Sequence, residues 1–183
     1  MDSLSGNQVQ PVPFELVLDQ NRLARRIEAL GTQITQDYAD KRLVMLGVLK
    51  GCMVFIADLI RHIKLPLEVE FVSAGTSRSG IRQEDDLVFT PSAVSSIRGR
   101  HVLIVEGIVD TGRTANVIIG RLAKMEPASV EIVTLLDKPG SHRTAIDIKY
   151  KGFSIGNDFV IGFGMDNAQK YRNLPFIGRV IDS

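Results

Sequence analysis

Two carboxylates, Glu106 and Asp110, stand four residues apart and are followed directly by a small, hydroxyl-rich run, residues 111–114. Residues 102–105 before them are apolar and rich in β-branched side chains, which is typical of a strand buried in a parallel sheet. Residues 115–125 then repeat apolar side chains with helical spacing. The predicted order is therefore a strand, an acidic turn, a short polar loop and a helix.

The start of that helix is suited to hold a phosphate group. Its first backbone N–H groups lack partners within the helix, and the helix dipole places positive charge there. Thr111 and Thr114 add hydroxyl donors, and Gly112 allows the backbone to approach a ligand closely. The neighbouring carboxylates would repel a bare phosphate, so the ligand should also carry hydroxyl groups, a cation or a transferable proton. A sugar phosphate with bound Mg²⁺ meets these conditions.

Less specific interpretations of the same residues stay open. Asp-Thr-Gly is also common turn chemistry, so Asp110 or Thr111 could simply cap an ordinary helix. The loop is not a Walker loop, because the Gly-x-x-x-x-Gly-Lys-Ser/Thr pattern is absent. The histidines His62, His101 and His142 show no metal-binding spacing, and we interpret them as structural or solvated.

Strand-like apolar runs alternate with helical patterns through the middle of the chain, which predicts an α/β fold with a mostly parallel sheet flanked by helices. The predicted helices are residues 21–38, 52–63 and 115–125, and the predicted strands are residues 43–49, 67–73, 102–105, 130–136, 152–155, 159–162 and 174–181, the last of which closes the sheet. The charged residues that come just after apolar strand runs are Lys50, Glu106, Asp110, Lys138 and Asp166. Because ligands bind beyond the carboxyl ends of parallel strands, we expect these side chains to converge on one edge.

Length and composition indicate a single domain. A chain of 183 residues has the size of one domain. We expect residues 1–13 to form a flexible tail and residues 14–183 to form the domain. At about residues 74–96 a small polar run precedes a charged patch, which favours a mobile two-stranded flap over the active site. A plain surface loop is the alternative interpretation of this segment.

Charge and cysteine content limit the partners. A net charge of +1 gives no electrostatic case for binding nucleic acid or a membrane surface, and no apolar run approaches the roughly 20 residues that span a bilayer. The N-terminus lacks the apolar core of a signal peptide. Cys52 is the single cysteine and lies among apolar residues, so we expect a buried thiol, no disulfide and a location in the reducing cytoplasm.

The segment around the two carboxylates closely resembles the phosphoribosyl pyrophosphate signature of the phosphoribosyltransferases, in particular the hypoxanthine-guanine (6-oxopurine) branch. It reads Val-Leu-Ile-Val-Glu-Gly-Ile-Val-Asp-Thr-Gly-Arg-Thr over residues 102–114. Further family motifs occur in the expected order, at residues 47–51 before this segment and at residues 135–139, 159–166 and 170–178 after it. The resemblance covers about residues 16–180. It implies the type I phosphoribosyltransferase fold with a small hood beside the sheet.

The resemblance implies a reaction in purine salvage. The 5-phosphoribosyl group of phosphoribosyl pyrophosphate would pass to N9 of hypoxanthine or guanine, with Mg²⁺ as cofactor and pyrophosphate as the leaving group. Asp110 would be the general base toward the purine N7 proton, and Glu106 would meet the ribose hydroxyl groups and the metal. The 5′-phosphate would be held by Asp110, Thr111, Gly112, Arg113 and Thr114. The family also implies a homodimer or homotetramer.

Three further residues would bind the purine in this family. Lys138 would donate to the 6-oxo group, which favours an oxygen over the amino group of adenine. Phe159 would stack on the base, and the backbone of Val160 would read its edge. Without the resemblance, Phe159 is more typical of a core residue and Lys138 of a lysine in a turn.

The metal and pyrophosphate roles fall on residues that are far apart in the sequence. Asp166 would coordinate Mg²⁺, which prefers carboxylate oxygens; alone, it could cap a short helix over residues 167–171. Lys50, Gly51 and Arg172 would contact pyrophosphate, although Arg172 alone suggests only a surface cation. The family resemblance also implies a cis peptide bond between Lys50 and Gly51.

Two departures from the family pattern matter. The family usually has an acidic pair where this chain has Glu106 and Gly107. We therefore expect weaker substrate binding or slower turnover, and a gain in activity when an aspartate is restored at position 107. Residues 73–79 lack the Ser-Tyr pair that closes over the reacting atoms in family loops. These departures motivate an alternative function, a catalytically weakened nucleotide-binding sensor or regulator.

Overall fold

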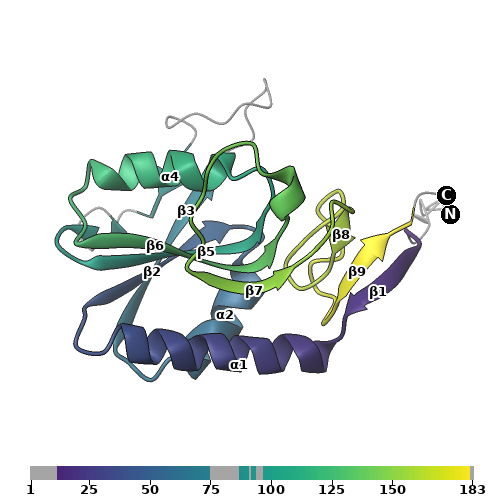
Figure 1. Ribbon diagram of the computed structural model, residues 1–183, viewed down its shortest axis with the longest axis horizontal. Coiled ribbons are helices and arrows are strands. Elements are labelled where there is room, and N and C mark those ends of the chain that lie inside the picture. The colour runs from purple at the N-terminus through teal and green to yellow at the C-terminus, as the bar shows by residue number, and fades with distance from the viewer. Residues whose placement is uncertain (1–11, 75–86, 91, 94–96, 182–183) are drawn as a thin grey trace, which may run out of the picture.

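The computed structural model describes residues 12–74, 87–90, 92–93 and 97–181, and Figure 1 shows their arrangement. The elements are β1 (Phe14–Leu18), α1 (Gln20–Asp37), β2 (Leu43–Leu49), α2 (Met53–His62), β3 (Leu67–Ala74), β4 (Leu87–Phe89), β5 (His101–Val109), α4 (Arg113–Ala123), β6 (Ser129–Asp137), the 3-10 helix η2 (Pro139–Ser141), β7 (Tyr150–Ser154), β8 (Val160–Ile161) and β9 (Ile177–Val180). Nearly all of the predicted tail and most of the predicted flap lie outside the described residues. The division into tail, domain and flap therefore stays a prediction.

Six strands form the main sheet in the order β4-β3-β2-β5-β6-β7. Every neighbouring pair is parallel except β3 and β4, which pair antiparallel at one edge. This arrangement confirms the predicted α/β fold with a mostly parallel sheet. The central strand β2 is buried from Leu43 to Val48, as expected for a strand that packs against helices on both faces.

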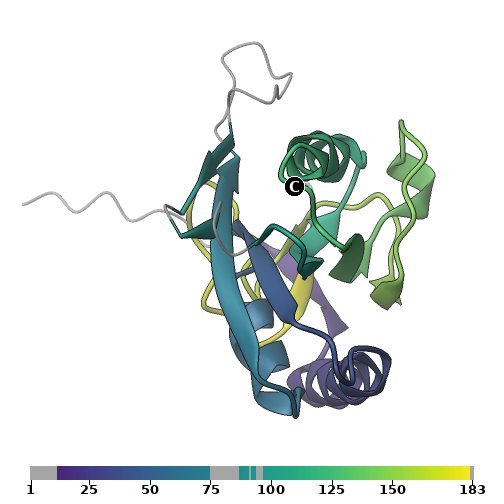
Figure 2. The same ribbon diagram turned by 90° about the vertical axis from the view of Figure 1, so that its left-hand side faces the viewer.

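Helices cover both faces of the main sheet, as Figures 1 and 2 show from two directions. On one face, Leu23 of α1 and Phe55 of α2 pack in the same apolar cluster as Leu103 of β5. On the other face, Ile118 of α4 packs with Ile104 of β5. Successive residues of β5 therefore point into the two halves of the core, and the strand is held rigidly between them.

A separate three-stranded antiparallel sheet, β1-β9-β8, stands beside the main sheet and forms the hood (Figure 1, right). The prediction that residues 174–181 close the main sheet was wrong, because β9 pairs with β1 and β8 instead. The physical reason for this error is that a short apolar run indicates a strand but does not specify the strand with which it pairs. Strand β1 was not predicted.

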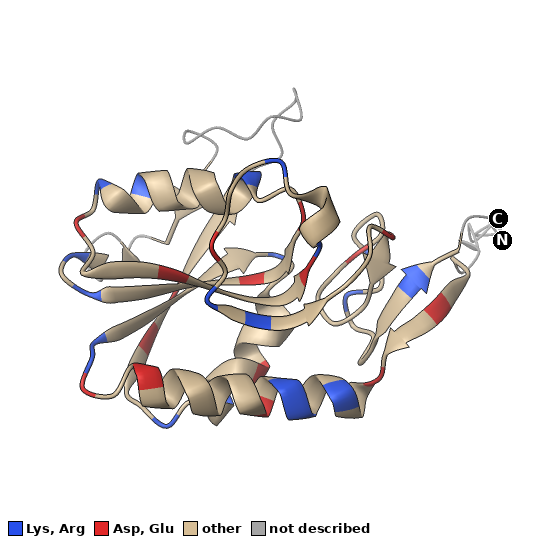
Figure 3. Cartoon of the chain, viewed as in Figure 1, with Lys and Arg blue, Asp and Glu red and all other residues tan. Residues whose placement is uncertain are grey.

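Charged residues of both signs are interspersed over the elements in the view of Figure 3. This distribution agrees with the net charge of +1 and offers no large region of one sign in that view. Among the residues described by the structure, none of the helices combines the length and the apolar character needed to cross a membrane.

Candidate active site

Strand β5 carries Glu106 into the site from within the sheet. The prediction of an acidic turn starting at residue 106 was wrong, because the parallel ladder with β6 continues to the pair Val109 and Asp137. Glu106 is consequently buried, with 7% of its surface exposed, whereas Asp110 is the first residue after the strand and is exposed. The two carboxylates thus sit at different depths at the same sheet edge.

The loop after β5 leads directly into α4. Gly112 is the N-cap of α4, with a φ of 77° and no side-chain capping bond, so the interpretation of Asp110 or Thr111 as the cap was wrong. A β-carbon at Gly112 would also lie 3.0 Å from Thr144 Oγ1. A pocket of about 370 Å³ adjoins the loop and is lined by Glu106 and residues 108–115. Uncapped N–H groups at a helix start facing a pocket can bind an anion.

A second pocket, of about 560 Å³, brings together residues that are far apart in the sequence. Its lining includes Lys50, Glu106, Asp110, Lys138 and Asp166, which confirms the predicted convergence of these charges. The other predicted residues in this lining are Gly51, Phe159, Val160 and Arg172. Glu106 and Asp110 line both pockets, so the two pockets adjoin at these carboxylates.

Lys138 faces Asp110 across this junction. Its Nζ lies 3.5 Å from Asp110 Oδ2, and its side chain is 7% exposed while that of Asp110 is 52% exposed. The backbone N–H of Lys138 donates to Val109 O at 2.9 Å, which ties the end of β6 to the end of β5. A lysine in a surface turn would extend into solvent; this one instead points its ammonium group at the pocket carboxylate.

Phe159 presents its ring to the second pocket. It is 54% exposed, so the interpretation as a core residue does not hold. Its carbonyl accepts a hydrogen bond from Val180 N–H at 2.9 Å, and the next residue, Val160, pairs with Arg179 in the hood sheet. The hood therefore fixes the backbone directly after an exposed aromatic ring that can stack on a flat ligand.

Asp166 and Arg172 form a paired cluster on the hood side of the pocket. Asp166 Oδ1 lies 2.6 Å from Arg172 Nη2, and Asp166 Oδ2 accepts the Gln169 N–H at 2.9 Å. Gln169 Oε1 in turn accepts from Lys50 Nζ at 3.2 Å. Arg172 also donates to Gly164 O at 2.7 Å and is 15% exposed, so it is not the freely solvated cation that the sequence alone suggested.

One expectation and one alternative interpretation of the backbone near these residues were wrong. The cis peptide bond joins Leu49 to Lys50 and not Lys50 to Gly51. Because the cis bond does not precede a proline, the sequence contains no residue that locates it. Residues 167–171 form turns with an isolated bridge between Asn167 and Lys170, so no short helix follows Asp166.

Gly107 packs directly against the Lys50–Gly51 backbone. A β-carbon at this position would lie 2.5 Å from Gly51 O and 3.1 Å from Met165 Sδ. The Gly51 carbonyl is also close to Gly164, where a β-carbon would lie 2.3 Å from it. The second carboxylate of the family pattern is therefore replaced here by a close backbone contact, which leaves no room for a side chain unless the loop moves.

Cys52 directly follows Gly51 in the chain and is fully buried, as predicted. Burial, and secondarily the negative charge of Glu106, raises the pKa of the Cys52 thiol to about 12. The thiol is therefore neutral at physiological pH and contributes packing instead of chemistry.

A family model of the phosphoribosyl transferase domain matches residues 15–168. The chain belongs to this family. A hypoxanthine phosphoribosyltransferase from Haemophilus influenzae is 41% identical over 170 residues, which are 91% of this chain and 95% of that protein. A hypoxanthine-guanine phosphoribosyltransferase from Streptococcus pneumoniae is 37% identical over 164 residues, covering 90% of this chain and 91% of that protein.

A solved structure supports the same assignment. The hypoxanthine-guanine phosphoribosyltransferase of Bacillus anthracis matches with a TM-score of 0.83 at 35% identity, covering 93% of this chain and 99% of that chain. The resemblance inferred from the motifs and the type I phosphoribosyltransferase fold are thereby confirmed.

Two groups of residues in the site of this phosphoribosyltransferase were missed from the sequence. Gln169 connects Lys50 to the Asp166 cluster, and its position between two predicted residues, Asp166 and Arg172, was an available signal. Asp137 and His142 contact one another beside Lys138. Asp137 directly precedes Lys138 in the sequence, but nothing in the spacing indicates that His142 turns back to it.

Proposed function

We propose that this phosphoribosyltransferase transfers the 5-phosphoribosyl group of phosphoribosyl pyrophosphate to N9 of hypoxanthine or guanine, giving IMP or GMP and pyrophosphate in purine salvage. One observation carries the proposal: the two pockets adjoin at Asp110, with the start of α4 on one side and Lys138 and Phe159 on the other. A purine nucleotide likewise joins an anionic phosphate to a flat base through a ribose. The names of the relatives support the same substrate class.

The chemistry requires one bond to form, one to break and one proton to leave the purine. Purine N9 bonds to ribose C1′, the bond from C1′ to the pyrophosphate oxygen breaks, and the purine N7 proton moves to a general base of the protein. Asp110 is that base in our proposal, because its carboxylate is exposed at the junction of the two pockets. The transition state resembles an oxocarbenium ion, so positioning of the base and stabilisation of the leaving pyrophosphate matter most.

Lys138 selects the base in this proposal. An ammonium group carries three N–H donors and no acceptor, so Lys138 can face Asp110 and still donate to a purine 6-oxo oxygen. Adenine would present an amino group there, which leaves a buried donor without a partner. Phe159 then offers its exposed ring to the face of the bound base.

The pyrophosphate would be bound on the opposite side of the pocket, by Lys50, the backbone of Gly51 and Arg172. Support for this role comes from the fixed geometry of Arg172, whose guanidinium is held by Gly164 O and Asp166 before any substrate arrives. Preorganised cations of this kind stabilise developing negative charge without further reorganisation.

The residues present fit an Mg²⁺ ion that enters with the substrate. Asp166 and Glu106 supply carboxylates to the pocket, and no cluster of three or more His, Cys, Asp or Glu side chains able to hold a metal occurs among the described residues. Mg²⁺ is commonly held through one or two carboxylates together with substrate phosphates. We propose that Asp166, with Glu106, holds the ion of magnesium phosphoribosyl pyrophosphate. When bound, the ion supplies positive charge that stabilises the leaving pyrophosphate.

A spectrophotometric assay with phosphoribosyl pyrophosphate, Mg²⁺ and each of four bases tests the proposal. We expect nucleotide formation with hypoxanthine or guanine and none with adenine, while xanthine ranks the tolerance for a second oxo group. No product with any base would refute the proposed function. Nucleotide binding by calorimetry without product would instead establish the sensor, which no feature of the described site favours.

We also propose that the chain acts as a homodimer or homotetramer in the cytoplasm. The family resemblance supports the oligomer, and the single buried thiol fits a reducing compartment. Size-exclusion chromatography with light scattering measures the assembly directly; a monomer at working concentration would contradict the first part of this proposal.

A further inference from the structure

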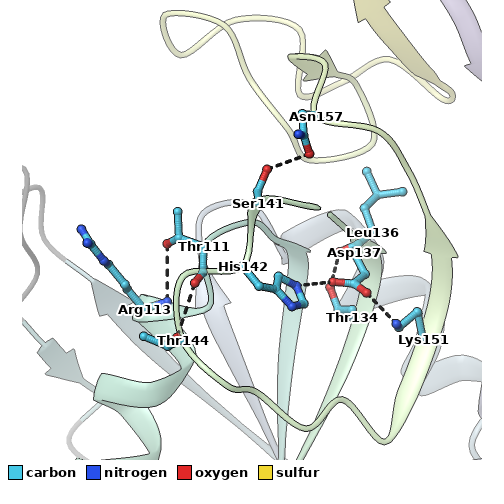
Figure 4. A network of polar contacts seen from close by, with 10 residues as sticks. All are labelled: Thr111, Arg113, Thr134, Leu136, Asp137, Ser141, His142, Thr144, Lys151 and Asn157. Atoms are coloured by element: carbon cyan, nitrogen blue, oxygen red, sulfur yellow. Dashed lines mark hydrogen bonds and ion pairs between the residues drawn. The ribbon is translucent and has the colours of Figure 1, made fainter. Parts of the chain in front are cut away.

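A fully buried carboxylate lies immediately beside Lys138. Asp137 is the last residue of β6 and is 0% exposed. Its Oδ1 lies 2.7 Å from His142 Nε2 and its Oδ2 lies 2.6 Å from Lys151 Nζ, as Figure 4 shows. Because an ionised carboxylate only accepts hydrogen bonds, the histidine donates its Nε2–H in this contact. A carboxylate this deeply buried requires such partners.

The two partners of Asp137 lead to different parts of the molecule. Lys151 belongs to β7, the edge strand of the sheet. His142 follows the 3-10 helix η2, at the start of a segment that returns to the loop before α4. One carboxylate thus contacts both a regular strand and an irregular segment, and only the irregular segment reaches the phosphate side of the site.

The residues after His142 hydrogen-bond the loop between β5 and α4, residues 110–112, which we call the phosphate loop. Arg143 N–H donates to Thr111 O at 3.1 Å. Thr144 Oγ1 donates to the same carbonyl at 3.4 Å, as Figure 4 shows. Within η2 itself, Ser141 N–H donates to Lys138 O at 2.9 Å, which ties the end of the 3-10 helix to Lys138. A continuous chain of contacts therefore connects Lys138, at the base side of the site, with Thr111, in the loop at the phosphate side.

We propose that His142 is a positioning residue: by holding Asp137, it fixes residues 138–144 and so sets the distance between Lys138 and the phosphate loop. The inference rests on the proposed function, because it assigns the base to Lys138 and the 5′-phosphate to the loop at Thr111. His142 is not among the residues that line the two pockets of the site. It acts through the backbone on either side of η2, and a displacement of about 1 Å at reacting groups can cost up to ~100-fold in rate.

Two substitutions of similar polarity test the contact. In His142→Gln the amide nitrogen can take the place of Nε2 and donate to Asp137, whereas in His142→Asn the shorter side chain cannot reach it. We expect His142→Gln to retain wild-type kinetics. We expect His142→Asn to lower kcat/KM for phosphoribosyl pyrophosphate by about 10-fold or more, on the scale of a misplaced catalytic group. Equal kinetics for the two variants would overturn the inference.

Lys151→Met is the matched control, because it removes the other partner of the same buried carboxylate. It should lower the melting temperature, since a buried charge loses a partner, but leave kcat/KM unchanged, since β7 does not hold the phosphate loop. If His142→Asn and Lys151→Met reduced kcat/KM equally, the role of His142 would be structural only, and the inference would be rejected.

Amide hydrogen exchange separates this inference from the proposed function. The Arg143 amide, bonded to Thr111 O, should exchange faster in His142→Asn than in wild type, and at the wild-type rate in Lys151→Met. If the wild type forms no nucleotide but the two variants show this exchange pattern, the proposed function is refuted and the positioning contact stands. An active wild type with unchanged Arg143 exchange in His142→Asn would refute the positioning contact.

Discussion

Restoring an aspartate at position 107 should lower activity, contrary to the expectation from the family pattern. The β-carbon of Gly107→Asp would lie 2.5 Å from Gly51 O, where an ordinary contact begins at 3.4 Å. The Gly51 carbonyl must therefore retreat by about 0.9 Å, or strand β5 must shift by a similar amount. Because β5 is packed on both faces, we expect the loop at Lys50–Gly51 to move.

The displaced loop carries residues that line the pyrophosphate side of the pocket. A shift of about 1 Å in a binding group can cost up to ~100-fold in rate, and overpacking of this kind costs about 1–3 kcal/mol of stability. We predict that kcat/KM falls by about 10- to 100-fold. KM for phosphoribosyl pyrophosphate should rise more than KM for the base, because Lys138 and Phe159 lie on other segments.

The assay is steady-state kinetics of Gly107→Asp beside Gly107→Ala, which adds the same β-carbon without the charge. Gly156→Ala is the control, since its β-carbon would meet only Asp158 Oδ2 at 3.5 Å. We expect both variants at position 107 to lose activity and the control to retain it. Unchanged or increased kcat/KM in Gly107→Asp would refute the steric reasoning. An increase would show in addition that the missing carboxylate limits the enzyme.

Three further predictions concern the base, the ring and the buried thiol. Asp110→Asn should lower kcat by about 10²- to 10⁴-fold with little change in melting temperature, measured by the nucleotide assay and calorimetry; normal turnover would exclude Asp110 as the base. Phe159→Ala should raise KM for hypoxanthine by about 10-fold, since stacking on an aromatic ring contributes about 1–3 kcal/mol, and a KM equal to wild type would remove the stacking role. The pKa of Cys52 is raised by burial to about 12, so its contribution to stability is complete below pH 9 and is lost as pH rises toward 12. The free energy of unfolding should therefore fall more steeply above pH 9 in the wild type than in Cys52→Ala, whereas parallel curves would contradict the shift.

The sequence was most informative where apolar runs are long and the chemistry follows directly. Strand β2 was predicted with the bounds that the structure shows, Leu43–Leu49, because continuous burial on two faces demands an unbroken apolar run. The same reasoning placed Lys50, Asp110 and Lys138 after strand ends and so at one pocket. Topology then carried the prediction, since parallel strands bring their carboxyl ends to one edge.

The sequence was least informative where pairing across space decides the structure. The hood strands are too short for their patterns to identify a partner, so β9 was assigned to the wrong sheet. The histidine at position 142 has no spacing signal, because its contact with Asp137 depends on the turn at η2. The glycine at position 107 suggested a missing charge, and only the folded structure reveals the Gly51 carbonyl that fills the space.

A crystal structure with bound inosine monophosphate tests the central claim most directly, because it locates both ends of the ligand at once. We predict that the phosphate lies on the backbone N–H groups of residues 110–114, with the base against Phe159 and its 6-oxo oxygen near Lys138 Nζ. A nucleotide bound with its phosphate away from the start of α4, or with its base away from Lys138, would contradict the account.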